Sequence, residues 1–212
     1  MPILWLLADQ FVSAFAEASG PFGWRGRPDG DDEFVIFSKP LDSEIYSELG
    51  LDLTERDFGL SLNPSVSVRH ERASDLHAQF FGFEQGPSQV AASLSDLARH
   101  AGRGSGMMRT VERIEDINVK VREVLSDIAE LGEQFYARYS TMPDLVRYLE
   151  GSARTSLELG QLALAYALTG DREKADSVLS KLEEIAAQQP TLPAAQTTRF
   201  LDAFRAYFEN FA

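Results

Sequence analysis

The sequence predicts an α+β protein with an N-terminal helix, a short antiparallel sheet of four to six strands and a helical C-terminal half. Changes in hydrophobic period lead to this prediction. Apolar residues recur at three- and four-residue steps before residue 20, alternate with polar residues in short runs between residues 33 and 111, and return to the helical period beyond residue 112. Strands and helices that are segregated along a chain are typical of α+β folds. For 212 residues we expect one domain, 1–212, with a helix-and-sheet subregion at 1–112 and a helical half at 113–212.

Residues 1–19 are predicted to form an amphipathic helix that ends at Gly20-Pro21. No basic residue precedes the apolar run, and Asp9 and Gln10 interrupt it, which argues against a secretory signal peptide. No run in the chain reaches 18 apolar residues, so no membrane span is predicted and we expect a cytoplasmic protein. One face of the helix carries Leu4, Leu7, Ala8, Phe11, Phe15 and Ala18.

The strongest strand signal is the run 33–37, and together with 23–27 it predicts a hairpin around a turn-rich segment. A short helix is expected at 43–49. Residues 58–62 and 66–68 alternate between apolar and polar side chains. Because Asn63-Pro64-Ser65 lies between them, we expect a second hairpin that turns at this point.

The middle of the chain mixes both periods. Residues 72–81 have helical spacing, and 107–111 could form a last strand. The run 89–97 fits a strand and a helix equally well. The glycine-rich run 102–106 is predicted to be a loop.

The C-terminal half is predicted to be helical throughout. Apolar residues from 114 to 131 follow a short heptad-like seam, which favours a helix packed on the sheet. Residues 142–149 should form another helix, and 156–168 are apolar almost all round, as expected for a buried helix. The next helix ends near Pro190 and Pro193. The last helix carries an aromatic stripe that indicates core packing, formed by Phe200, Phe204, Tyr207, Phe208 and Phe211.

The chain is acidic, with 33 acidic and 20 basic residues and a formal net charge of −13. The acidity is spread along the sequence. A field of this sign repels phosphate groups, so nucleic-acid binding is disfavoured. Association with basic partners is favoured.

Residues that usually build catalytic or metal sites are sparse. Cysteine is absent, which excludes disulfides and thiolate chemistry. The histidines are His70, His77 and His100, and the run that begins at His70-Glu71 has Ser74 where a His-Glu-x-x-His motif needs its second zinc ligand. The run 102–106 lacks the spacing of a dinucleotide fingerprint. We therefore predict no catalytic, metal-binding or cofactor-binding residues and no cofactor.

The most distinctive surface signal is a carboxylate-rich turn close to a tryptophan. An aromatic side chain beside several carboxylates could form a hot spot for a protein partner. Equally, aspartate and glycine at a turn can serve turn geometry alone. The candidate partner-binding residues are Trp24, Asp29, Asp31, Asp32 and Glu33.

Residues 159–171, LGQLALAYALTGD, followed by Lys174-Ala175, resemble one tetratricopeptide turn. A single copy cannot stack into a solenoid, which needs about three repeats, so this resemblance implies a helical hairpin only.

A broader resemblance covers about two thirds of the chain. A leading helix and an aromatic hairpin precede the run Leu62–His70, which enters a helix; the run Met107–Glu115 then leads into a long helix that reaches Phe135–Ser140. This order is similar to a loose group of small acidic bacterial proteins, several of which look like immunity proteins of polymorphic or contact-delivered toxins. The resemblance implies binding to a toxin, but immunity proteins use surfaces that differ between pairs, so it assigns no residue.

The main hypothesis is a non-enzymatic immunity protein that covers the active site of one basic toxin or effector. It would bind neither nucleic acid nor membrane and would be a monomer or a dimer. An adaptor or secretion chaperone that uses the helical face at 114–131 is the first alternative. An uncatalogued enzyme that uses carboxylates or His70 is the second.

Overall fold

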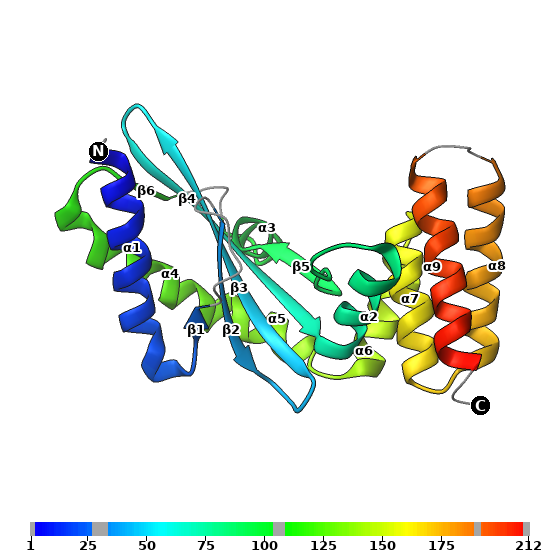
Figure 1. The fold of residues 1–212 in the computed structure, drawn as a ribbon. Coiled ribbons are helices and arrows are strands. Elements are labelled where there is room, and N and C mark those ends of the chain that lie inside the picture. Colours follow the sequence, from blue (N-terminus) through cyan, green and yellow to red (C-terminus); the bar gives the residue numbers. More distant parts are fainter. Residues whose placement is uncertain (1–2, 27–33, 104–108, 189–191, 210–212) are drawn as a thin grey trace. The chain divides into compact units, whose positions relative to one another are not determined.

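The computed structural model describes residues 3–26, 34–103, 109–188 and 192–209 (Figure 1). It confirms the α+β class, with an N-terminal helix, a six-stranded antiparallel sheet and a helical C-terminal half. No helix within these ranges is long and apolar enough to cross a membrane.

The chain forms two compact units, and each is described by itself. Unit 1 consists of residues 1–68 and 91–138, and unit 2 consists of residues 69–90 and 139–212. Each unit therefore combines segments from both sides of the boundary at residue 112 that the composition indicates.

Unit 1 begins with helix α1, Ile3–Ser19, and a short 3-10 helix η1, Gly20–Phe22. The predicted apolar face of α1 is confirmed where it is described, because Phe11 and Phe15 are fully buried. The Phe15 ring lies 4.8 Å from the ring of Phe37 on the sheet, measured between centroids. The helix therefore covers one face of the sheet through this aromatic contact.

The sheet has the order β1-β2-β3-β4-β5, and β6 also pairs with β4. Strand β2 pairs antiparallel with β1 and β3, and Phe37 is opposite Leu49 in the β2–β3 register. The strands are β1 Arg25–Gly26, β2 Phe34–Pro40, β3 Ile45–Arg56, β4 Gly59–His70, β5 Val90–Ser93 and β6 Arg109–Val111.

The short helix expected at 43–49 is wrong, because these residues belong to a turn and to the start of β3. Leu49, Leu51 and Leu53 are all buried on one face of the strand. Pairing with β2 and burial at every second position outweigh the weak local preference for a helix.

The turn expected at Asn63-Pro64-Ser65 is also wrong, because β4 runs without a break through these residues. The true turn is Asp57-Phe58, between β3 and β4. Proline has no N–H to give to a neighbouring strand. Within the described part of the chain, β6 pairs with residues 60–62 of β4, and Pro64 lies beyond this stretch.

The ambiguous run 89–97 contains both predicted structures in succession. Residues 90–93 form β5, and the Ser93 hydroxyl then accepts a hydrogen bond from the N–H of Asp96 at 3.0 Å and caps helix α3, Leu94–His100. The strand expected at 107–111 is confirmed over its described part, which is β6. Most of the loop predicted at 102–106 lies outside the described residues.

The remaining helices of unit 1 follow β6. They are η2 Ile114–Asp116, α4 Ile117–Asp127, the π-helical turn η3 Ile128–Gly132 and α5 Glu133–Arg138. Helix α4 packs against α1. Figure 1 shows α4 and α5 crossing behind the strands. The predicted seam is buried from Ile117 onward, but its first residue, Ile114, is exposed.

Unit 2 is a group of helices: α2 Glu71–Phe81, α6 Met142–Ser152, α7 Ser156–Leu168, α8 Arg172–Gln188 and α9 Leu192–Glu209. Helix α7 is buried on nearly every side, as predicted, and Thr155 and Glu158 form a capping box at its start. The run that resembles a tetratricopeptide turn is the α7–α8 hairpin.

An aromatic cluster forms the core of unit 2. The rings of Phe81 and Phe200 stack with 4.5 Å between their centroids, and Phe80 meets Phe200 edge-on at 5.8 Å. Gly160 lies against this cluster, since a Cβ there would be 2.6 Å from the Phe81 ring. The aromatic stripe of the last helix is thus confirmed as core at Phe200 and Phe204, whereas Phe211 lies outside the described residues.

Candidate functional site

Trp24, the aromatic residue of the predicted contact site, is in the core of unit 1 with 4% of its surface exposed. Gly23, with φ +86°, ends η1 and turns the chain toward β1. The indole ring lies 5.8 Å from the ring of Tyr136, and the Lys39 Nζ is 5.4 Å from the indole centroid. The structure therefore gives Trp24 a packing role, and its contribution to partner binding stays a prediction.

The four carboxylates predicted beside Trp24 fall outside the described residues. They are Asp29, Asp31, Asp32 and Glu33. Their role as partner contacts stays a prediction.

Tyr136, which packs against Trp24, is itself buried and hydrogen-bonded. Its hydroxyl donates a hydrogen bond to the backbone carbonyl of Glu48 at 2.9 Å. Burial raises the pKa of the Tyr136 phenol well above its ordinary value, helped by the charges of Glu133 and Glu48. The phenol therefore stays protonated and acts as a donor. No sequence signal links Trp24 to a residue that is more than a hundred positions away.

The three histidines lie in different parts of the fold. His70 ends β4 and caps α2, because its Nδ1 accepts a hydrogen bond from the N–H of Ala73 at 3.4 Å. His77 is buried in unit 2, and His100 is exposed at the end of α3. No group of three or more metal-binding side chains occurs among the described residues.

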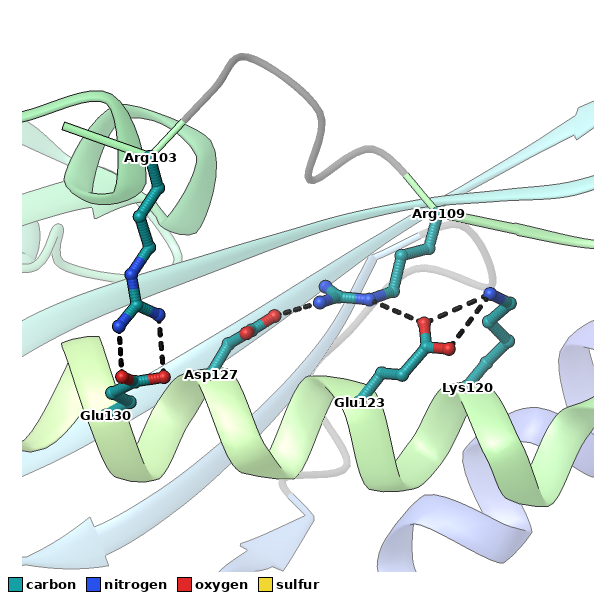
Figure 2. Close-up of polar contacts among 6 residues, drawn as sticks. All are labelled: Arg103, Arg109, Lys120, Glu123, Asp127 and Glu130. Atoms are coloured by element: carbon teal, nitrogen blue, oxygen red, sulfur yellow. Dashed lines mark hydrogen bonds and ion pairs between the residues drawn. The ribbon is translucent and has the colours of Figure 1, made fainter. Parts of the chain in front are cut away.

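A ridge of charged residues runs along α4 and η3, and we call it the α4 ridge (Figure 2). Arg109, from β6, pairs with Asp127 and also donates through Nε to Glu123 Oε2 at 3.2 Å. The Lys120 Nζ approaches the same Glu123 oxygen at 3.0 Å. Glu130 lies one helical turn beyond Asp127 and forms a bidentate ion pair with Arg103.

Burial differs along the α4 ridge. The side chains of Arg109 and Asp127 are 11% and 12% exposed, whereas those of Arg103 and Glu130 are about half exposed. The Arg109 Nη1 is buried and makes no hydrogen bond within the described part of the chain. The Arg109–Asp127 pair thus ties β6 to α4 in a place where water competes weakly.

Two of the ridge carboxylates, Glu123 and Glu130, have lowered pKa values. Partial burial acts to raise the pKa of Glu123, but hydrogen bonds and charge from Lys120 and Arg109 outweigh it, so this pKa is lowered. The hydrogen bond from Arg103 likewise lowers the pKa of Glu130. Carboxylates that stay ionised at neutral pH are poor proton donors. The α4 ridge therefore supplies fixed charge and positions β6 on α4.

The sequence carries part of the signal for the α4 ridge. Glu123, Asp127 and Glu130 are spaced by four and three residues, which places them on one face of a helix. Arg103 lies within the glycine-rich run, and Arg109 follows it. The position of Arg109 beside Glu123 and Asp127 depends on strand pairing, because β6 lies antiparallel to β4 with Leu60 opposite Val111.

Unit 2 has an open cleft of about 230 Å³ between α8 and α9, with Ala167 of α7 at its side. Its apolar lining is Ala167, Ala175, Leu179, Phe204 and Phe208, and its charged lining is Arg172, Asp176 and Arg205. The Arg172 Nη2 donates to the carbonyl of Phe208 at 3.1 Å, and Arg205 pairs with Glu183. The lining offers apolar, cationic and anionic contacts.

Comparison of the chain with protein-family models, curated proteins and solved structures gives no match.

Proposed function

We propose that this protein is a non-enzymatic binding protein that neutralises a basic partner. More specifically, we propose a bacterial immunity protein that covers the active site of one cognate toxin. The observation that carries the proposal is the distribution of charge between the two units. Unit 1 has 20 acidic and 11 basic residues, whereas unit 2 has 13 acidic and 9 basic residues.

The acidic excess of unit 1 is concentrated around β2 and β3. Residues 29–57 include ten acidic residues and only two basic ones, Lys39 and Arg56. No basic residue occurs between positions 40 and 55. Asp42 and Glu44 are exposed in the β2–β3 turn, and Asp52 is half-buried on β3.

The two acidic regions of unit 1 differ in how many basic residues accompany their carboxylates. On the α4 ridge, Arg103, Arg109 and Lys120 are paired with the carboxylates. Around β2 and β3 the sequence supplies few bases to do the same. The field of unit 1 is therefore dominated by the strand region, which favours approach of a positively charged surface.

A toxin that acts on nucleic acid needs a basic cleft to hold phosphate groups. An acidic protein that docks over such a cleft would exclude the substrate and would be attracted to it over a distance of about one Debye length, roughly 8 Å at physiological salt. This mechanism requires surface complementarity and no catalytic residue on the inhibitor.

The test is affinity capture of the tagged protein from cells of its source, at low and high salt, with identification and stoichiometry by mass spectrometry. We expect one stoichiometric basic protein whose association slows as salt rises. Recovery of no stoichiometric basic protein would contradict the proposal.

A charge variant and a matched control test the surface. D42N/E44Q/D52N removes three negative charges near β2 and β3, and E173Q/E184Q/D202N removes three exposed ones from unit 2. We expect the first variant to slow association of the captured partner by about tenfold and the second to change it less than twofold. Equal slowing would assign the effect to net charge alone.

A further inference from the structure

The large apolar side chains that unit 1 leaves exposed are unevenly placed. They are Leu6, Phe22, Phe58, Ile114 and Val119. Phe58, which is 64% exposed, is in the β3–β4 turn, and Ile114, which is 48% exposed, is in η2. These two residues belong to segments that are far apart in sequence, but the sheet brings the segments together.

The pairing of β4 with β6 makes this juxtaposition. Leu60 is opposite Val111, so continuing the antiparallel register places Phe58 opposite Arg113, next to Ile114. The backbones are also close, because a Cβ on Gly59 would overlap the carbonyl oxygen of Val111 and lie 3.1 Å from the Glu112 Cα. Gly59 has φ +143°, a conformation that favours glycine. We call Asp57, Phe58, Glu112 and Ile114 the hairpin-tip patch.

The patch has a buried ion pair near one side and exposed ion pairs on the other. Two residues before Val111, Arg109 is anchored to α4 by its pair with Asp127. On the other side, Arg113 Nη1 lies 3.4 Å from a carboxylate oxygen of Glu115, and its Nε lies 3.9 Å from one of Asp116. A surface that is held in place before binding loses less conformational entropy when a partner docks.

The patch combines exposed apolar and acidic side chains. Asp57, Glu112 and Glu115 are exposed, as are Phe58 and Ile114. Residues 55–58 and 112–116 together include five acidic and two basic residues. Aromatic anchors inside a polar rim are typical of protein–protein interfaces, and exposed apolar groups that adjoin one another mark such sites more strongly than scattered ones.

We propose that the hairpin-tip patch is the surface through which unit 1 docks on a basic protein partner, with Phe58 as the anchor. This inference rests on the proposed function and names its contact surface. The occupant is a folded protein with an apolar socket for the Phe58 ring, surrounded by lysine and arginine side chains that pair with Asp57 and Glu112. Charge complementarity selects this occupant over an acidic protein or a second copy of this chain.

The test uses site-specific photo-crosslinking in the full chain. p-Benzoylphenylalanine replaces Phe58 in one variant and Phe22 in the other. Phe22 is the matched control, because it is also 64% exposed in unit 1 but lies just beyond the C-terminal end of α1. We expect a single crosslinked product to a basic protein at position 58 and none at position 22. Both side chains are exposed, so the thermal unfolding midpoint should not change.

A second measurement tests the energetic role. F58A should weaken binding of the crosslinked protein by about 30-fold, as expected for a hot spot, while F22A should change it less than twofold. D57K/E112K should abolish the crosslink from position 58 through charge repulsion.

The outcomes separate the two proposals. If affinity capture recovers a stoichiometric basic partner, but position 58 gives no crosslink or F58A binds as the wild type does, the docking surface is wrong and the proposed function stands. If neither capture nor crosslinking finds a basic protein, both proposals are overturned. Equal crosslinking at positions 22 and 58 also overturns the docking surface.

Discussion

Unit 1 and unit 2 use the same kinds of residue for different purposes. Unit 1 has a net charge of −9 and leaves five large apolar side chains exposed among its described residues, whereas unit 2 has a net charge of −4 and packs most of its phenylalanines in one buried cluster. The acidic excess is therefore concentrated in one unit and the large phenylalanine cluster in the other. Unit 1 has surface features that its own folding does not explain, and the aromatic residues of unit 2 are explained by packing.

The comparison can be measured because both tryptophans, Trp5 and Trp24, belong to unit 1. Tryptophan fluorescence therefore reports on unit 1 alone. Far-UV circular dichroism at 222 nm reports on the helices of both units, and unit 2 supplies the larger share of them. The two signals allow the unfolding of the units to be compared in one sample.

The largest effect is expected from the aromatic cluster of unit 2. F200A removes a fully buried ring that stacks on Phe81, and we expect a loss of about 3–5 kcal/mol in the free energy of unfolding. In a denaturant titration the helical signal should move to lower concentration more than the tryptophan signal. The exposed F22A serves as the control and should move neither. Equal shifts of both signals after F200A would mean that the two cores unfold as one.

A smaller effect is expected from the α4 ridge in unit 1. D127A leaves Arg109 buried without its main partner, and we expect a loss of about 2–3 kcal/mol, seen by tryptophan fluorescence. The matched variant E130A removes the partner of the half-exposed Arg103 and should cost less than about 1 kcal/mol. Similar losses in the two variants would show that burial does not set the strength of these pairs.

The smallest effect is a dependence on pH that is confined to unit 2. His77 is 1% exposed, its Nε2 lies 3.0 Å from the Leu157 carbonyl, and its Nδ1 is buried without a hydrogen bond in the described structure. Burial lowers the pKa of His77 below the ordinary 6.5, although the hydrogen bond to Leu157 opposes this. The unfolded chain then binds a proton more readily than the folded unit does. Stability is complete above pH 6.5 and falls as the pH drops toward the lower pKa of the folded state.

H77Q should remove this pH dependence from the helical unfolding signal, and the tryptophan signal should lack it in every variant. H100Q is the control, because the His100 ring is exposed. Persistence of the full pH dependence in H77Q would assign it to other groups.

Sequence patterns predicted the helices well and the two longest strands poorly. The helices of unit 2 and the strand at 33–37 were predicted because their apolar residues repeat over several turns or alternations. The turn at Pro64 and the helix at 43–49 were wrong because the local signals of a few residues yielded to strand pairing over twelve residues in β3 and β4. At 89–97 both periods were present because a strand and a helix follow one another there.

The candidate sites show the same limit. Trp24 was predicted to contribute to partner binding beside the carboxylate-rich turn, but the structure buries it against Tyr136 and Lys39. Ile114 looked like the start of a buried seam, but it is exposed in η2. The burial of Trp24 and the exposure of Ile114 both depend on residues that are distant in the sequence.

The sequence by itself determined the α+β class, the acidic charge and the buried aromatic stripe, because each depends on composition or on a local period. The tertiary structure alone decided which charged groups pair on the α4 ridge. It also decided that Trp24 is buried and that Phe58 is exposed. The physical reason is that burial and pairing are set by strand register and helix contacts. Those contacts join residues such as Gly59 and Val111, whose proximity no local pattern encodes.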